Sequence, residues 1–260
     1  MGVLNVTPDS FSDGGRFLSS EDAVAHAVEL VEEGADLLDV GAESTRPGSD
    51  RVSCDQQIAR LEPIMGKITQ LGVPVSIDTT SSEVASYALR AGAAIINDIS
   101  AGRDDPKMLP LAGREKAAIV LMHMLDQPKT MQNDPRYENV VTTVTDFLSQ
   151  RLQLALDAGI DRKRIMLDPG IGFGKTLMHN LELLAGLGRL AELGCAVLVG
   201  PSRKRFIGEL TDEPQPDRRI AGTLAACILA YERGATVFRV HDVKFVSQAL
   251  ELAWAIKQVK

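Results

Sequence analysis

The feature that most constrains the fold is a regular alternation between short apolar runs and longer segments with helical periodicity. It repeats about eight times along the 260 residues. A repeated strand-then-helix pattern is typical of a parallel sheet whose strands are joined by helices, and eight repeats favour a closed (β/α)₈ barrel, the α/β fold called a TIM barrel. An open, doubly wound sheet is the alternative, because periodicity alone does not show closure. The expected strands are residues 2–6, 36–40, 74–78, 94–98, 118–123, 164–168, 196–200 and 236–241.

The helices between these strands have recognisable starts and ends. The first is expected to begin from a cap at Ser19 or Ser20 and to end before Gly34. Thr80 and Glu83 have the spacing of a capping box for a later helix. Further helices are expected over residues 141–158, 218–233 and 243–257. In the first helix, an apolar stripe suited to packing on a barrel is formed by Val24, Ala27, Val28 and Val31.

Size, charge and cysteine content limit the class of protein. A chain of this length with 45% hydrophobic residues can bury one large core, so we expect one domain over residues 1–260. The net charge of −7 argues against a nucleic-acid-binding protein. No apolar run reaches the roughly 20 residues that span a bilayer. Cys54, Cys195 and Cys227 lack the spacing of a disulfide framework or a zinc site. We therefore expect a cytoplasmic protein that binds neither nucleic acid nor membranes.

Each of the eight expected strands ends in, or is followed closely by, polar residues. In a barrel these ends lie together on the C-terminal face, where the following loops build the active site. A single polar residue there is usually a cap or a turn residue, but eight such ends in succession favour a site. They are Asn5; Asp39 with Glu43; Asp78; Asn97 with Asp98; His123; Asp168; Ser202 with Arg203 and Lys204; and Arg239 with His241.

The sixth strand end belongs to an unusual stretch, residues 165–175, with the sequence IMLDPGIGFGK. An apolar run leads to Asp168, after which Pro169 and alternating glycines turn the chain sharply. Asp168 either caps its own turn or faces a ligand from an apolar wall, and the recurrence of polar strand ends favours the ligand. The stretch is not a Walker A loop, because Pro169 stands where that motif needs glycine, and its glycine spacing misses the dinucleotide fingerprint.

The polar strand ends divide into two chemical groups. Asp78, Asn97 and Asp168 offer hydrogen-bond acceptors and an amide, which suit a heterocycle with several N–H donors such as an amino-oxo-pyrimidine ring. The cations after the last two strands suit an anion, since phosphate sites of such barrels lie there. For some of these cations a solvated surface position is the alternative. The cationic group is Arg203, Lys204, Arg205, Arg239 and His241.

The histidines do not have metal-ligand spacing. His26 and His179 fall on expected helices, and His123 suits wall-lining as well as catalysis. A metal ion held tightly by protein side chains is therefore not expected, whereas Mg²⁺ that arrives with a phosphorylated substrate is compatible with Asn5. Two polar segments, residues 7–17 and 43–50, are candidate lids that exclude water during a reaction.

Together and in this order, these motifs resemble the dihydropteroate synthase family, and the resemblance covers essentially the whole chain. Arg205 departs from the pattern, because some members have serine there, near the aminobenzoate carboxylate. The resemblance rests on GVLNVTPDSFSDGG from Gly2, ESTRPG from Glu43, SIDT from Ser76, ND at Asn97, LMH from Leu121, LDPG and GFGK between Leu167 and Lys175, SRK from Ser202 and RVHD from Arg239.

The resemblance implies a transferase of folate biosynthesis that uses Mg²⁺, forms a homodimer and is a sulfonamide target. It would join 6-hydroxymethyl-7,8-dihydropterin pyrophosphate to p-aminobenzoate and release pyrophosphate.

The resemblance also implies a role for particular residues. Asn5 would contact the metal, and the catalytic residues would be Asp78, Lys204, Arg239 and His241. Pyrophosphate would contact Asn5, Thr45, Arg239 and His241. The pterin would contact Asp78, Asn97, Met122, Asp168, Phe173 and Lys204. The aminobenzoate and loop residues would be Phe11, Arg46, Pro47, Phe173, Lys204 and Arg205.

Two other functions remain open at this point. A pterin-binding methyltransferase barrel of the methyltetrahydrofolate–corrinoid type would also use acidic and amide groups. It has no need for a pyrophosphate site, so the cations of the last strands count against it. A non-catalytic pterin-binding homologue would not need both candidate lids.

Overall fold

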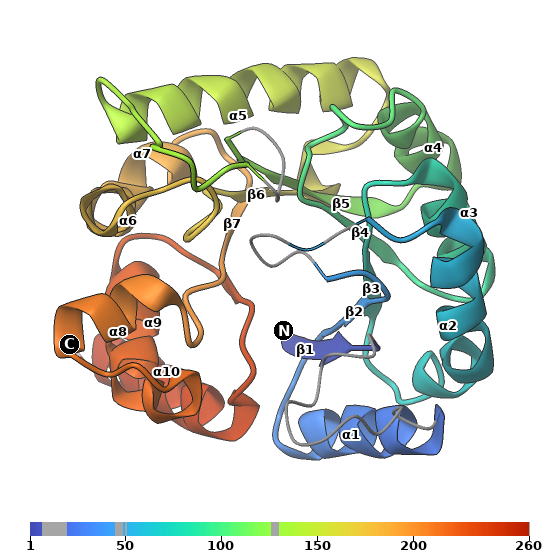
Figure 1. The fold of residues 1–260 in the computed structure, drawn as a ribbon, viewed down its shortest axis with the longest axis horizontal. Helices are drawn as coiled ribbons and strands as arrows, with labels where there is room; N and C mark the ends of the chain where they lie inside the picture. The colour runs from blue at the N-terminus through green and yellow to red at the C-terminus, as the bar shows by residue number, and fades with distance from the viewer. Residues whose placement is uncertain (7–19, 45–48, 50, 126–129, 260) are drawn as a thin grey trace.

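The structure is a computed structural model and describes residues 1–6, 20–44, 49, 51–125 and 130–259. Eight strands follow one another around the molecule in chain order, and the helices surround them (Figure 1). Each strand pairs in parallel with the next. The strands are β1 (Gly2–Asn5), β2 (Leu38–Gly41), β3 (Val75–Asp78), β4 (Ile95–Asp98), β5 (Ala118–Met122), β6 (Ile165–Asp168), β7 (Ala196–Val199) and β8 (Val237–Phe238).

The sheet closes through the chain that follows β8. Gly2 forms a parallel bridge with Val240. The Val3 amide donates to the Val240 carbonyl at 3.1 Å, and the Val240 amide donates to the Met1 carbonyl at 3.0 Å. β8 is short because the pairing passes here from β7 to β1; Arg239 is the last residue whose amide donates to β7, at 3.0 Å. The predicted (β/α)₈ barrel is confirmed, and the open-sheet alternative is wrong.

All eight expected strands are present, and the first seven begin and end within two residues of their expected bounds. β8 ends three residues earlier than expected, for the reason just given. Connecting helices occupy the expected places. They are α1 (Ser20–Glu32), α2 (Cys54–Ile68), α3 (Ser82–Arg90), α4 (Met108–Glu115), α5 (Val140–Asp157), α6 (Leu177–Ala185), α7 (Leu187–Ala191), α8 (Arg205–Thr211), α9 (Ile220–Glu232) and α10 (Val243–Gln258). None of the helices in the described ranges combines the length and apolar character that a bilayer crossing needs.

Of two local predictions about helices, one holds in part and one is wrong. The fully buried residues of α1 are Ala23, Ala27 and Leu30. Ala27 belongs to the expected stripe, and Val24 and Val31 of that stripe are partly buried against the core, so the buried face is centred about one residue earlier than expected. The predicted Thr80–Glu83 capping box is wrong. Ser81 caps α3 instead, accepting a hydrogen bond from the Val84 amide at 3.4 Å, because the chain stays extended through Ser81 and the helix begins one residue later.

The pleat of the strands sorts their side chains into two layers. Outward residues join the large core that the strands share with the helices; they include Val40, Ile77, Ile96, Leu121 and Leu167. Alternate residues face the barrel interior and form a smaller cluster: Met1, Ile95, Val120, Met166 and Leu198. A polar residue two positions beyond an interior residue also faces the interior, as Asn97 does after Ile95 and Asp168 after Met166. The strand sequences thus place polar groups inside the barrel, beyond its apolar cluster.

The turn after β6 depends on a glycine. Gly170 has φ +68°, and a Cβ built there would lie 1.9 Å from the His123 carbonyl oxygen. We expect Gly170→Ala to destabilise the protein by about 3 kcal/mol or more, because backbone strain and a backbone clash add. Gly72→Ala is the matched control: Gly72 has φ +83° but no described neighbour within 4 Å, so only strain applies, about 1 kcal/mol. Equal losses of unfolding free energy in urea would contradict the clash.

Candidate active site

The interior-facing strand ends bring together most of the predicted site. Asp78 ends β3, Asn97 lies in β4, Asp168 ends β6 and Arg239 follows β8. The three acidic or amide side chains are each buried, with 3% to 6% of their surface exposed. The groups come from strands distributed around the barrel, so closure of the sheet is what assembles them.

Arg239 is the centre of a buried polar network. Its Nε donates to Asp39 Oδ2 at 2.6 Å, and its Nη2 donates to Asp78 Oδ2 at 3.0 Å. The Asn97 amide nitrogen donates to the same Asp39 oxygen at 3.1 Å. Sequence reasoning placed Asp39 at a strand end but assigned it no site role. The alternation of side chains along the strands could have placed Asp39 in the site. Asp39 pairs with Ser76, and Ser76 lies two residues before Asp78, so all three side chains face the barrel interior.

The two site carboxyls ionise less readily than ordinary aspartates. Burial raises the pKa of Asp78 to about 7; the Arg239 charge opposes this, whereas the Asp39, Glu43 and Asp98 carboxylates add to it. Burial raises the pKa of Asp168 to about 6 against the Gly170 amide and the Lys204 charge. Both carboxyl groups therefore change their ionisation state near neutral pH. In the ionised form they can accept hydrogen bonds from ring N–H groups.

A cation and an aromatic ring form one side of the mouth. Lys204 Nζ lies 4.2 Å from the centre of the Phe173 ring, a cation–π contact. Burial and the Arg239 charge lower the pKa of Lys204 to about 8. Phe173 also packs against an apolar cluster that can cover one face of a flat ring: Ile99, Met122, Met124 and Met131. Met122 belongs to this cluster, and its contact with the pterin, which the family resemblance implies, stays a prediction.

His241 is a neutral hydrogen-bonding group in this environment. Burial and the charge of Arg239 lower its pKa to about 3. The Ser202 hydroxyl accepts from the His241 amide at 3.2 Å and lies 3.0 Å from His241 Nδ1. We infer that the hydroxyl donates to Nδ1, which leaves the ring proton on Nε2. His241 then offers an anion an N–H donor rather than a full charge.

Two of the predicted cations have other partners. The Arg203 guanidinium is paired with Asp242 at 2.5 and 3.0 Å. Its backbone is left-handed, with φ +58°, and its amide donates to Thr223 Oγ1 at 3.1 Å. Arg205 lies on α8 with 90% of its side chain exposed, 3.7 Å from Glu209. Arg203 thus braces the segment that carries Lys204, and the role of Arg205 toward aminobenzoate stays a prediction.

Lys175 is a buried residue that belongs to the GFGK motif of the sequence but was assigned no role in the predicted site. Its Nζ donates to the Phe173 carbonyl at 2.9 Å and lies 3.1 Å from His123 Nδ1. Burial lowers the pKa of Lys175 to about 7 and that of His123 to about 2. His123 also packs edge-on against Phe147, with ring centres 5.0 Å apart. Lys175 thus connects His123 to the backbone of Phe173, and these packing contacts favour the wall-lining role for His123.

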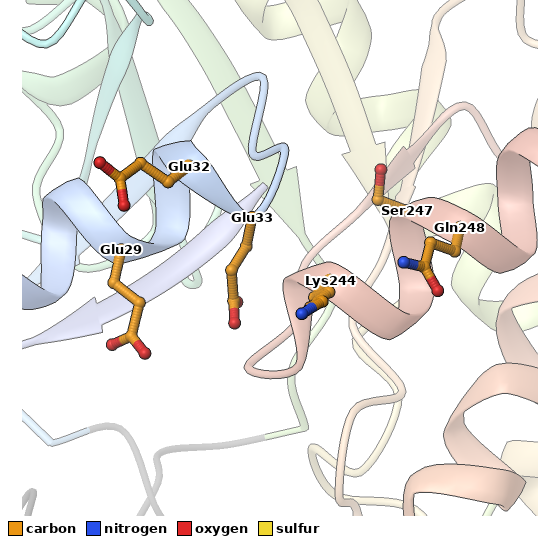
Figure 2. A pocket seen from close by; sticks show the side chains of 6 residues that line it. All are labelled: Glu29, Glu32, Glu33, Lys244, Ser247 and Gln248. Atoms are coloured by element: carbon orange, nitrogen blue, oxygen red, sulfur yellow. The ribbon is translucent and has the colours of Figure 1, made fainter.

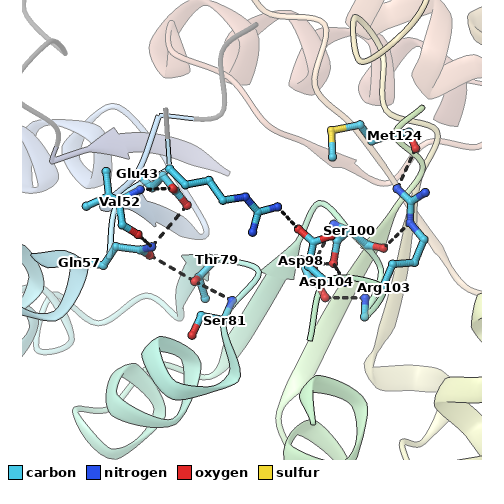
Figure 3. A network of polar contacts seen from close by, with 12 residues as sticks. Glu43, Val52, Gln57, Thr79, Ser81, Asp98, Ser100, Arg103, Asp104 and Met124 are labelled. Carbon is cyan, nitrogen blue, oxygen red and sulfur yellow. Dashed lines mark hydrogen bonds and ion pairs between the residues drawn. The ribbon is translucent and has the colours of Figure 1, made fainter. Parts of the chain in front are cut away.

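Other strand-end groups hold loops in place. Asp98 faces outward and accepts from the Ser100 and Gly102 amides at 2.8 and 2.6 Å, so here the turn-cap interpretation holds. Glu43 accepts from the Val52 amide at 2.6 Å, and Arg103 donates to the Met124 carbonyl at 2.8 Å. Figure 3 shows these contacts as parts of a polar network beside the ends of β2 to β5. The network fixes the chain that flanks the mouth.

Some of the expected site lies outside the described residues. This applies to Phe11, Thr45, Arg46 and Pro47, and to most of the two candidate lids. Asn5 is described: it ends β1, is half-buried, and its amide oxygen faces Gly41. In the described part of the chain, no three His, Cys, Asp or Glu side chains form a metal-binding group.

A cavity of about 360 Å³ lies elsewhere, on the outer wall between α1 and α10 (Figure 2). It is lined by Glu29, Glu32, Glu33, Lys244, Ser247 and Gln248. These residues belong to α10 and to α1 with the turn that follows it, and not to the strand ends, so the cavity is separate from the candidate active site.

The fold and the polar mouth agree with a known class of enzyme. Residues 1–241 match the family described as pterin binding enzyme. The chain therefore belongs to the pterin-binding enzymes.

Within that class, the chain is similar to several dihydropteroate synthases. The enzyme of Synechocystis sp. is 46% identical over 98% of this chain and 89% of its own length. A Xanthomonas albilineans dihydropteroate synthase with 4-aminobenzoic acid has a TM-score of 0.93 and 46% identity, covering 100% of this chain and 93% of that one. The Yersinia pestis dihydropteroate synthase in a sulfonamide drug complex has a TM-score of 0.94 and 39% identity, covering 99% of this chain and 94% of that one. The chain is thus a member of the dihydropteroate synthases, which are transferases, and the methyltransferase alternative is not favoured.

Proposed function

We propose that the protein joins 6-hydroxymethyl-7,8-dihydropterin pyrophosphate to p-aminobenzoate, giving 7,8-dihydropteroate and pyrophosphate. The observation that carries this proposal is the set of buried acceptors inside the barrel mouth, Asp78, Asn97 and Asp168, beside Arg239 and Lys204. A pterin presents several N–H donors on one edge, and buried acceptors without such a ligand would be costly.

The site residues divide between holding the ring and handling the leaving group. Asp168 and Asn97 accept hydrogen bonds from the N–H groups of the pterin ring, while Met122 and Phe173 cover the faces of the ring. In the reaction, the bond between the exocyclic carbon and the pyrophosphate oxygen breaks, and the electron pair leaves with pyrophosphate. The aminobenzoate nitrogen then forms the new C–N bond and loses a proton. The ionised carboxyls stabilise positive charge on the ring, and Arg239 with the His241 N–H stabilises the departing anion.

Mg²⁺ is part of this proposal. Asn5 fits the ion chemically, because an amide oxygen is a hard ligand and Mg²⁺ takes most of its ligands from water and phosphate. Asn5 would hold the ion, which supplies positive charge to the pyrophosphate.

The aminobenzoate would lie beside the cation–π pair of Lys204 and Phe173. Arg205 at the start of α8 is proposed to act on its carboxylate from the outer side. Phe11, Arg46, Pro47 and Thr45, which lie outside the described residues, complete the proposed substrate contacts.

A homodimer in the cytoplasm is also proposed. Large apolar side chains are exposed on the last helices, among them Leu229, Phe245, Leu252, Trp254 and Ile256. An apolar surface of this kind favours self-association, and a molar mass in solution of one chain would contradict it. The three cysteines are unpaired, which agrees with a reducing compartment.

The test of the function is pyrophosphate release from the dihydropterin pyrophosphate with Mg²⁺, measured with and without p-aminobenzoate. The expected result is release that depends on p-aminobenzoate, yields dihydropteroate and is lost when a chelator removes the metal. Tight binding of the pterin without any release would contradict the proposed function.

A further inference from the structure

Asp39 connects two groups of the proposed site without lying at the mouth itself. It is fully buried in β2, with 0% of its surface exposed. Its Oδ2 accepts from Arg239 Nε at 2.6 Å and from Asn97 Nδ2 at 3.1 Å. Asn97 lies on β4 and Arg239 follows β8, so a single oxygen atom of Asp39 connects two groups that come from non-adjacent strands of the barrel.

We propose that Asp39 is a positioning residue for the pterin substrate. It orients the Asn97 amide and the Arg239 guanidinium, and it adds its own negative charge to that of Asp78. This inference rests on the function proposed above and adds a residue that the sequence comparison with the family did not assign.

The orientation of Asn97 follows from the hydrogen-bond chemistry of its amide. An asparagine side chain can turn over, exchanging its donor and its acceptor. A carboxylate can only accept, so Asp39 holds the Asn97 nitrogen toward itself and leaves the carbonyl oxygen for a ligand. Asn97 therefore presents an acceptor to a ring N–H group. Without the Asp39 charge, both amide orientations become possible.

The orientation of Arg239 follows from its two described contacts. Nε is used by Asp39 and one Nη2 hydrogen by Asp78. Because the guanidinium is planar, fixing two of its nitrogens fixes the direction of the remaining N–H groups. Within the described residues no contact uses Nη1 of Arg239, so that nitrogen is left for the leaving group.

The charges of this network destabilise the folded protein, which suggests that they serve the site and not the fold. Two buried carboxyl groups share one guanidinium, so the three groups carry a net negative charge when both carboxyls are ionised, which for Asp78 means above a pH of about 7. Among the described residues, Asp39 Oδ1, Ser76 Oγ and Asp78 Oδ1 are buried without a hydrogen-bond partner. Buried polar groups of this kind destabilise a fold. A net negative charge inside the mouth does, however, stabilise a cationic pterin centre.

The charged groups around Asp78 determine what Asp39 does to it. Arg239 attracts a negative charge on Asp78, whereas Asp39, Glu43 and Asp98 repel it; Lys204 also interacts with Asp78. Removing the charge of Asp39 removes one repulsion and leaves Arg239 to Asp78 alone. The pKa of Asp78 then falls, and ionised Asp78 persists to lower pH.

The test is Asp39→Asn, which keeps the size of the side chain and one acceptor for Arg239 but removes the charge. We expect pterin pyrophosphate affinity, measured by calorimetry, to fall by about tenfold or more. We expect kcat to fall as well, because the cationic centre loses a stabilising charge. The acidic limb of the pH profile of pterin binding should move to lower pH by about one unit. The melting temperature at pH 8 should be unchanged or higher.

Ser76→Ala is the matched control, because Ser76 is the register partner of Asp39, is fully buried and has no role in the proposed site. It should leave affinity, kcat and the pH limb unchanged. Asp39→Glu is the second variant, because it keeps the charge but moves it by the length of one methylene group. The affinity for the pterin pyrophosphate should therefore fall, while the acidic limb of the pH profile of pterin binding should stay at the wild-type pH.

Each outcome decides the inference. An Asp39→Asn protein with wild-type affinity and an unmoved pH limb would overturn it. A protein that fails to fold, or melts lower in parallel with its lost activity, would also overturn it, because Asp39 would then serve the fold. Failure of the proposed function is distinguishable: the wild-type protein itself would then show no release dependent on p-aminobenzoate.

Discussion

Replacing Arg239 by alanine is expected to reduce kcat by about 10²–10³-fold and to weaken pterin binding as well. The loss in kcat follows from removal of a preorganised donor to the departing pyrophosphate. The loss in binding follows from the network: Arg239 holds Asp39 at 2.6 Å and Asp78 at 3.0 Å. Without the guanidinium, two neighbouring buried carboxylates repel each other, so the pKa of Asp78 rises above about 7 and less of it is ionised at neutral pH.

The same substitution should also destabilise the fold. Leaving buried charges without their partner costs about 3–5 kcal/mol at pH 8, and less at pH 5, where Asp78 is protonated. The measurements are steady-state kinetics, calorimetry with the pterin substrate and urea unfolding at both pH values. Arg239→Lys keeps one charge but cannot hold both carboxylates, so it should recover part of the stability and little of the turnover. Arg114→Ala, which removes an exposed arginine paired with its neighbour Glu115, is the surface control. An Arg239→Ala protein that binds pterin normally and loses only kcat would contradict the network argument.

The barrel was predictable because its signals are local. A buried strand in a parallel sheet is a short apolar run, and the helix that returns the chain has its own period. The carboxyl ends of such strands must share one face, so Asp168 and Asn97 were placed from strand limits alone. Their inward direction follows from the two-residue alternation of each strand, since Ile95 and Met166 precede them in phase.

What could not be predicted depends on partners far apart in the chain. Asp39 and Arg239 are separated by 200 residues, and only the closed barrel brings them together. Arg203 and Arg205 look alike in sequence, but the left-handed backbone at Arg203 directs it to Asp242, and the helical start at Arg205 exposes it. Lys175 lies in a recognisable stretch, yet its contacts with His123 and Phe173 come from the folded loop.

Asp168→Asn is the second substitution with a large expected effect, and it should separate binding from stability. A neutral amide in place of the carboxylate can still accept from the Gly170 amide, a contact of 2.7 Å in the wild-type protein. It cannot accept from two ring N–H groups, and its own NH₂ faces them. We expect pterin affinity to fall by about 10²-fold, because hydrogen bonds to a buried charge are lost and a donor meets a donor.

The stability of the Asp168→Asn protein should change in the opposite direction. The pKa of Asp168 is raised to about 6 in the folded protein, from an ordinary value of 3.8. Between these two pH values the folded state binds the proton more tightly, so the wild-type protein loses stability as pH rises through that window. A shift of about two units corresponds to about 3 kcal/mol above pH 6, which the amide does not lose. The variant should therefore melt higher than the wild-type protein at pH 8 and nearly equally at pH 4.

Asp134→Asn is the control, since Asp134 is exposed and pairs with exposed Arg136; neither affinity nor the pH dependence of melting should change. A lower melting temperature for Asp168→Asn at pH 8 would show that Asp168 holds its turn chiefly through its charge, and the turn-cap interpretation would then apply. A higher melting temperature combined with lost affinity would show a carboxylate that destabilises the empty barrel and is stabilised by the N–H donors of its ligand. Ligand binding should then protect the wild-type protein against unfolding far more than it protects the variant.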